Sequence, residues 1–156
     1  MSSSLKRDTT NYISIQKDNS TGFISSELAR SLSLKEGDYI RFDKGKEHAY
    51  DWFLYITQEK HNSARLSLPK STTMWRFNYK NAVNQICDTF KIGLERVKLE
   101  VEIKNPIVKP DFNGDDTELF SITDRPWERY DLEEAEREKY FGEYINARKK
   151  ATVPEN

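Results

Sequence analysis

The residue types that perform covalent catalysis are scarce in this 156-residue sequence. His48 and His61 are its only histidines, and its single cysteine, Cys87, falls on the apolar stripe of an expected helix. A nucleophilic cysteine requires an accessible thiol with a lowered pKa, whereas a cysteine that faces a core is inert. The sequence therefore favours a structural Cys87 over a catalytic Cys–His pair.

The spacings typical of metal and phosphate sites are also absent from the sequence. The chain has no C-x-x-C, no H-E-x-x-H, no regular calcium-binding loop and no glycine-rich phosphate loop. Asp115 and Asp116 carry oxygens that suit a hard cation, but a solvated loop accounts for them more simply. We predict that the protein is not an enzyme and uses no metal or cofactor.

The sequence does place aromatic and basic residues where they can act together. If Ile40, Leu54 and the other aliphatic residues of the expected strands face a core, alternation sends their neighbours to the opposite face. That face would carry Tyr39, Arg41, Phe53, Tyr55, Arg65 and Lys98, and Arg76 and Lys80 form a second cluster beside Trp75. Aromatic rings stack on bases while cations neutralise phosphates, so this pattern predicts a nucleic-acid-binding surface. The same face could instead be covered by the C-terminal segment, by a helix over 79–90, or by a second subunit.

Charge is distributed unevenly along the chain, although the net charge is only −1. Residues 1–105 contain 17 basic and 13 acidic side chains, and residues 106–156 contain 8 and 13. A mildly basic body with an acidic tail occurs in some nucleic-acid-binding proteins, where the tail competes for the basic surface. It also occurs by chance in many soluble proteins, and an excess of only four positive charges predicts modest, salt-sensitive DNA affinity.

Hydrophobic periodicity predicts the elements that would position these residues. Strands are expected over 11–16, 39–42, 51–57, 64–68, 74–78 and 96–104, with 51–57 and 64–68 joined as a hairpin. One helix is expected to begin at Ser25 or Ser26, whose hydroxyl can cap it, and to end before Gly37. A second helix is predicted over 79–90, because apolar residues recur there at intervals of three and four.

The stretch from Gly22 to Phe42 resembles the AbrB/MazE-like swapped-hairpin DNA-binding families. Their pattern is a strand, a short leucine-rich helix, a Gly-Asp pair and a second strand. The likeness rests on Gly22, Ile24, Glu27, Leu28, Leu32, Leu34, Gly37 and Asp38. It covers 21 of the 156 residues, the segment between Ile24 and Glu27 is shorter than in these families, and their proline before the helix is absent. The resemblance implies that this stretch belongs to a DNA-binding domain.

The C-terminal third of the chain is acidic and aromatic. Pro106 and Pro110 mark a boundary, an Asp- and Gly-rich loop follows over 111–117, and Asp131 with Glu134 forms a capping box for a helix near 132–150. This segment is too charged to form its own core, yet it carries Trp127, Tyr130, Tyr140, Phe141, Tyr144 and Ile145. Such segments dock in a groove, either on their own domain or on a partner. The sequence leaves both possibilities open.

Features that direct a protein to membranes or to secretion are not found in the sequence. No apolar run approaches the roughly 20 residues that span a bilayer, and the N-terminus lacks an apolar signal region. A single cysteine excludes an internal disulfide and suits a reducing compartment. We therefore expect a cytoplasmic protein with no membrane partner.

Together these patterns predict an α+β fold in three parts. They are a flexible N-terminus at 1–10, a compact domain over 11–105, and an extended or helical tail over 106–156. The compact domain is expected to hold a mostly antiparallel sheet of five or six strands with two helices. The first functional hypothesis is a small regulatory module, assembled as a homo-oligomer, that binds DNA or RNA. The second is a structural or adaptor protein of a larger assembly, such as a phage, that docks a partner or another copy through its tail.

Overall fold

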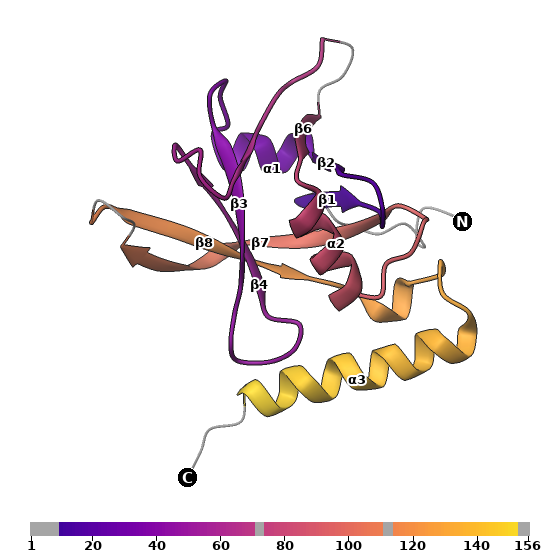
Figure 1. The fold of residues 1–156 in the computed structure, drawn as a ribbon. Coiled ribbons are helices and arrows are strands. Elements are labelled where there is room, and N and C mark those ends of the chain that lie inside the picture. Colours follow the sequence, from indigo (N-terminus) through magenta and orange to yellow (C-terminus); the bar gives the residue numbers. More distant parts are fainter. Residues whose placement is uncertain (1–9, 71–73, 111–113, 153–156) are drawn as a thin grey trace.

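The computed structural model describes residues 10–70, 74–110 and 114–152, which form three α-helices, one 3-10 helix and eight strands (Figure 1). The predicted flexible N-terminus lies outside these residues except for Thr10, as do residues 111–113 of the predicted loop. In chain order the elements are β1 (Tyr12–Ile15), β2 (Thr21–Ile24), α1 (Ser26–Ser31), β3 (Tyr39–Lys44), β4 (Trp52–Thr57), β5 (Ala64–Arg65), β6 (Trp75–Asn78), α2 (Lys80–Thr89), β7 (Val97–Pro110), β8 (Asp116–Thr123), η2 (Pro126–Glu128) and α3 (Glu134–Thr152).

The eight described strands belong to one antiparallel sheet in the order β5-β3-β4-β8-β7-β1-β2-β6. The two ends of this order meet, because Ser67, just beyond β5, pairs with Arg76 of β6. Two backbone hydrogen bonds of 2.9 and 2.7 Å form this pair, which we call the seam. The sheet is therefore a nearly closed barrel, and closure removes two of the strand edges that an open sheet would expose.

Alternation along the strands fills the inside of the barrel with apolar side chains. Fully buried aliphatic residues come from six of the strands: Ile13, Ile15, Ile24, Ile40, Leu54, Leu99 and Ile122. Burying each such side chain contributes about 1.5–3 kcal/mol relative to leaving it in water. The interior is thus the principal source of stability, and the outer face of the barrel is left for polar and aromatic groups.

The helices lie at the ends and side of the barrel (Figure 1). The Ser25 hydroxyl accepts a 3.2 Å hydrogen bond from the Leu28 amide, which confirms the predicted cap of α1. The predicted second helix is confirmed as α2, which buries an apolar stripe that includes Val83 and Ile86. Helix α3 crosses the end of the barrel opposite α1 (Figure 1). No described helix is both long and apolar enough to cross a membrane.

Strands β7 and β8 continue beyond the barrel as a two-stranded arm (Figure 1). Their register shifts between Glu102 and Ile107, where β7 contains an irregularity and Asn105 has a φ of 58°. Pro106 and Pro110 follow on β7. Proline cannot donate to an added strand, so these residues protect the edge of the arm from pairing with another chain.

The α+β class is confirmed, but the predicted sheet of five or six strands with two helices is wrong. Periodicity does not predict β2, which only the AbrB/MazE-like resemblance implies, or β8, which begins inside the loop predicted over 111–117. Strand β8 lies between β4 and β7 and completes the barrel wall. Its alternation is hard to recognise, because Leu119 and Phe120 are adjacent and both buried. The predicted hairpin of 51–57 with 64–68 is also wrong, since β3 lies between β4 and β5.

The close approach of β2 to β6 gives a test of the interior packing. A Cβ atom added at Gly22 would lie 2.3 Å from Cζ of Phe77, inside the packed barrel. We expect Gly22→Ala to lower the free energy of unfolding by about 1–3 kcal/mol, as overpacked cores do. Chemical denaturation of the purified protein measures this change.

Gly142 of α3 provides the matched control, because an added Cβ there meets nothing within 4 Å. The same Gly142→Ala change removes a flexible residue from a helix interior and should stabilise the protein by about 0.5–1 kcal/mol. Equal effects of the two substitutions would contradict the packing described for Gly22.

Candidate functional site

Five residues predicted to bind nucleic acid lie together on the outer face of β3, β4 and β5. Their strand neighbours Ile40, Leu54 and Ala64 point into the barrel and are buried. Direct cross-strand pairing joins Tyr39 to Arg65 and Arg41 to Tyr55. This group, the β3–β5 patch, consists of Tyr39, Arg41, Phe53, Tyr55 and Arg65.

The β3–β5 patch combines aromatic surface with a small positive charge. The guanidinium carbon of Arg41 lies 5.9 Å from the ring centroid of Tyr55, a cation–π distance. Nε of Arg41 is also 3.9 Å from the Asp43 carboxylate, which offsets part of its charge. Burial, with the nearby Asp43 charge, raises the pKa of the Tyr55 hydroxyl, so Tyr55 remains neutral. Arg65 is the more exposed cation of the patch.

The arm borders the β3–β5 patch on the β4 side. A cavity of about 210 Å³ lies between Arg41 and Tyr55 of the patch and Lys109 and Pro110 of the arm. Leu119 of β8 also lines this cavity and is only 4% exposed, although it lies outside the barrel. The arm therefore limits how far a ligand can extend over the patch in this direction.

The remaining predicted nucleic-acid contacts lie elsewhere on the molecule. Lys98 is on β7, Arg76 is on β6, and Lys80 begins α2, and all three side chains are exposed. Trp75 points into the barrel and is buried, so it does not share a face with Arg76. Lys98 alternates in phase with the β3–β5 patch, as expected, but β8 lies between its strand, β7, and β4 of that patch.

Arg76 and Lys98 instead lie beside aromatic and basic residues that were not predicted to bind nucleic acid. Nζ of Lys98 lies 4.6 Å from the ring centroid of Tyr12, and the guanidinium carbon of Arg96 lies 5.0 Å from that of Phe23. Phe23 is paired directly with Arg76. We call this group, Tyr12, Phe23, Arg76, Arg96 and Lys98, the β1–β2 patch. Tyr12 and Phe23 directly precede the buried residues Ile13 and Ile24. This alternation was the sequence signal that could have placed Tyr12 and Phe23 on the outer face.

The β1–β2 patch contains two arginines, Arg76 and Arg96, that form no ion pair with a carboxylate among the described residues. Arg96 donates to the backbone oxygens of Ser14, at 2.8 Å, and Thr21, at 3.5 Å. Burial lowers the pKa of Arg96, but an arginine remains charged at neutral pH. The nearby Glu100 carboxylate accepts a 3.1 Å hydrogen bond from Arg125, and the positive charge of Arg125 offsets the negative charge of Glu100. Three cations therefore surround the rings of this patch.

The groups that could perform covalent chemistry are not assembled into a site. Cys87 is fully buried on α2, and burial raises the pKa of its thiol to about 12. His48 accepts a 3.1 Å hydrogen bond from the Tyr50 amide, and burial lowers its pKa. Within the described ranges no group of three or more His, Cys, Asp or Glu residues could hold a metal ion. The absence of enzymatic activity stays a prediction.

The aromatic residues of the C-terminal segment divide into a buried and an exposed set. Tyr140 and Tyr144 of α3 are buried and pack against Tyr50, with ring centroids 5.9 and 4.9 Å away. Ile145 is half-buried beside them. Intramolecular docking thus accounts for these three of the residues predicted to contact a partner.

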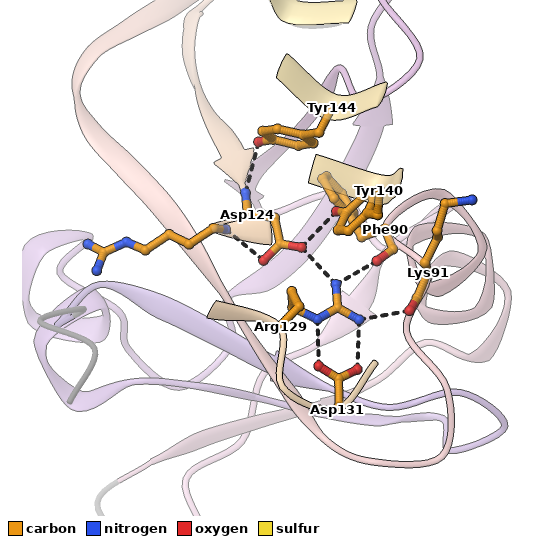
Figure 2. A network of polar contacts seen from close by, with 8 residues as sticks. Phe90, Lys91, Asp124, Arg129, Asp131, Tyr140 and Tyr144 are labelled. Carbon is orange, nitrogen blue, oxygen red and sulfur yellow. Dashed lines mark hydrogen bonds and ion pairs between the residues drawn. The ribbon is translucent and has the colours of Figure 1, made fainter. Parts of the chain in front are cut away.

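A buried arginine holds this segment against the barrel (Figure 2). Arg129 is 1% exposed, and its guanidinium makes five hydrogen bonds of 2.6–2.8 Å. The acceptors are the carboxylates of Asp124 and Asp131 and the backbone oxygens of Phe90 and Lys91. Burial opposes the charge, but the hydrogen bonds that Arg129 donates to Asp131 and the negative charge of Asp124 outweigh it and raise the pKa of Arg129.

Two tyrosines of α3 complete the same network (Figure 2). The Tyr140 hydroxyl donates to the Asp124 carboxylate at 2.7 Å, and the Tyr144 hydroxyl accepts from the Asp124 amide at 2.9 Å. Burial and the adjacent Asp124 charge raise the pKa of Tyr140, which therefore stays protonated. The network is satisfied internally and leaves no group directed at a ligand, so we interpret it as structural.

The exposed set comprises Trp127, Tyr130 and Phe141, whose exposed fractions are 48%, 76% and 40%. The rings of Trp127 and Phe141 are in edge-to-face contact with centroids 5.8 Å apart. Tyr130 is covered in part by Arg137, whose guanidinium carbon lies 4.5 Å from the ring centroid. We call Trp127, Tyr130 and Phe141 the α3 patch. It lies on the segment that the Arg129 network holds in place.

Comparison with family models, with curated proteins and with solved structures finds no match to this chain. The stretch that resembles the AbrB/MazE-like families forms β2, α1 and β3. Within the described sheet β2 lies between β1 and β6, whereas β3 lies between β4 and β5. The resemblance to these families stays a prediction.

The Arg129 network gives a test of how the C-terminal segment is attached. Lysine has three donors on a flexible stem, so Arg129→Lys would lose at least two of the five hydrogen bonds of Arg129. We expect a loss of about 3 kcal/mol in the free energy of unfolding, measured by chemical denaturation. Arg30→Lys is the matched control, because Arg30 is exposed on α1 and pairs only with Glu27 among the described residues. It should change stability by less than about 0.5 kcal/mol, and a similar loss in both variants would contradict the assignment.

Proposed function

We propose that this protein is a non-enzymatic nucleic-acid-binding module that uses the outer face of its barrel. The observation that carries the proposal is the pairing of aromatic rings with cations on that face. Arg41 lies over Tyr55, Arg96 over Phe23, and Lys98 over Tyr12. Each pair offers a ring that can stack on a base beside a charge that can neutralise a phosphate.

The charges on the outer face support this proposal. Among the described residues, no carboxylate forms an ion pair with Arg65, Arg76 or Arg96. Their charges are therefore available to phosphates. Binding through so few cations releases few counterions and should be weak and salt-sensitive.

Equilibrium titration of labelled DNA tests the proposed function. We expect micromolar or weaker binding at about 50 mM salt that is largely lost at about 200 mM salt. The double variant Arg41→Glu and Arg65→Glu should abolish binding while the circular dichroism spectrum is unchanged, since both side chains lie on the outer face. If neither single- nor double-stranded DNA binds at the lower salt concentration, the proposal is wrong.

The α3 patch supports a second candidate function, self-association or adaptor binding through the C-terminal segment. Trp127 and Phe141 are large, exposed and held in one arrangement by the buried Arg129 network. A groove of about 400 Å³ continues from Trp127 between the outer face of β7 and the side chains of Ile145 and Arg148. Rigid aromatic anchors beside a groove are typical of residues that dominate protein interfaces.

Light scattering over a range of concentrations tests the second candidate. We expect the wild-type protein to form a homo-oligomer that dissociates in the double variant Trp127→Ser and Phe141→Ser. Leu94→Ser is the control, because Leu94 is a 72%-exposed apolar residue in the turn between α2 and β7. A wild-type protein that remains monomeric at every concentration would exclude self-association through this patch.

A further inference from the structure

A single row of residues on the outer side of the sheet crosses the seam of the barrel, and in this row Ser14 is covered by its neighbours and only 6% exposed. Direct cross-strand pairing joins Lys98 to Ser14, Ser14 to Phe23, and Phe23 to Arg76. Arg76 is in turn paired with Ser67 across the seam. Residues that are paired directly in antiparallel strands point to the same side of the sheet. The β1–β2 patch therefore reaches the seam at Arg76.

The β3–β5 patch reaches the same seam from the other side. Arg65 precedes Ser67 by two residues, so both side chains face outward. Arg65 is paired with Tyr39, which begins the β3–β5 patch. Neighbouring strands lie about 4.8 Å apart, so Arg65 and Arg76 face the same short stretch of surface. The two patches are therefore one continuous surface, and its centre carries two exposed arginines.

We propose that this continuous surface binds single-stranded nucleic acid, which crosses the seam over Arg76, Arg65 and Tyr39. The inference rests on the proposed function and specifies its ligand. The strand contacts Phe23 on one side of the seam and Tyr39 on the other, and the arginines between them bind its phosphates. Beyond β4 the arm borders the β3–β5 patch and narrows the path that the nucleic-acid strand can take.

The shape of the surface favours a single strand over a duplex. The row follows the circumference of a barrel, so successive side chains point in different directions. A straight duplex touches a convex surface of this kind at one place, whereas a flexible strand can follow the curve. Stacking on Phe23 or Tyr39 also requires unpaired bases, because the bases of a duplex are already stacked on each other.

The distribution of charge places the centre of the site at the seam. At one end of the surface Asp43 offsets the charge of Arg41, whereas among the described residues no carboxylate forms an ion pair with Arg65 or Arg76 at the seam. The row consists of Ser14, Phe23, Arg76 and Ser67, and Arg65 and Tyr39 continue it without an acidic residue. Electrostatic attraction to phosphate is therefore strongest near Arg76 and Arg65.

The test compares a fluorescein-labelled DNA oligonucleotide of mixed sequence with the same oligonucleotide annealed to its complement. At about 50 mM salt we expect the full-length protein to bind the single strand at least tenfold more tightly than the duplex. Arg76→Glu should weaken single-strand binding by tenfold or more and make the salt dependence shallower by about 0.7 in the log–log slope. Tyr39→Ala should weaken it roughly 5- to 160-fold, as expected for loss of one stacked base.

Lys139→Glu is the matched control, because it makes the same change of charge at an exposed position of α3. It should alter single-strand affinity by less than about twofold. Arg76→Gln is measured as well as Arg76→Glu. If the charge-reversal variant fails to fold, Arg76→Gln still removes the positive charge from a folded protein. Arg76→Gln should weaken binding more than Lys139→Glu does.

Three results would overturn the inference or its premise, and they can be distinguished. Equal or tighter binding of the duplex would refute the single-strand assignment, and equal effects of Arg76→Gln and Lys139→Glu would refute the path over the seam. In both cases the proposed function survives if the Arg41→Glu and Arg65→Glu variant still loses binding. Absence of binding to either form of DNA would remove the proposed function itself.

Discussion

The two backbone hydrogen bonds between Ser67 and Arg76 are the constraint on which the arrangement of this protein depends. Without them the described strands would form an open sheet with β5 and β6 at its edges. Strand β5 has only two residues, and a pairing that short is weak on its own. Closure places it beside β6, supported by a further hydrogen bond of 2.9 Å from the Leu66 amide to the Asp38 oxygen. It also joins two surfaces that an open sheet would hold at opposite edges.

A second constraint acts at the end of the barrel, where the charge of Arg129 is buried. A buried guanidinium is tolerated only when its donors are satisfied, and each of the five N–H groups of Arg129 has an acceptor. Two of these acceptors, the oxygens of Phe90 and Lys91, belong to the end of α2 and the turn after it. The segment around η2 is thereby fixed relative to α2, and Trp127 and Phe141 are exposed in one arrangement. The acidic C-terminal segment is therefore held against the barrel, and its negative charges have a fixed position relative to it.

The sequence predicted much of the local structure, apart from β2 and β8, and the direction of most strand side chains. The cap at Ser25, helix α2 and the alternation of β3, β4 and β7 follow from patterns of a few residues. Alternation also placed Tyr39, Tyr55 and Arg65 outside while Ile40 and Leu54 lie inside. Sequence patterns do not encode which strands become neighbours, because pairing depends on contacts between distant residues. For that reason β3 was not expected between β4 and β5, and Arg65 was not expected beside Arg76.

The candidate surface was predicted in its residue types but not in its extent. Tyr12 lies on β1, whose strand was predicted although its outer residues were not selected, and Phe23 lies on β2, a strand of four residues that contains Gly22 and was not predicted from periodicity. Arg96 directly precedes β7, whereas Phe23 is on β2. Their contact depends on the order β7-β1-β2 in the sheet, which brings distant parts of the sequence together. The Arg129 network had no clear sequence signal, since apart from the nearby residues Asp124 and Asp131 its partners follow α2 or belong to α3 and are distant from Arg129 in the sequence.

The cation–aromatic pairs on the outer face have a consequence for the proposed complex. In the free protein, exposed pairs such as Lys98 with Tyr12 contribute about 0.5–1 kcal/mol each. A base stacked on an aromatic ring contributes about 1–3 kcal/mol, and a cation displaced from the ring can bind the adjoining phosphate. The exchange of an internal pair for a base and a phosphate is therefore favourable at each ring, and the same pairs hold the rings and cations in position before the ligand arrives. Phosphate contacts weaken as the salt concentration rises, whereas stacking does not. The relative contributions of phosphate contacts and stacking therefore determine how much binding remains at physiological ionic strength.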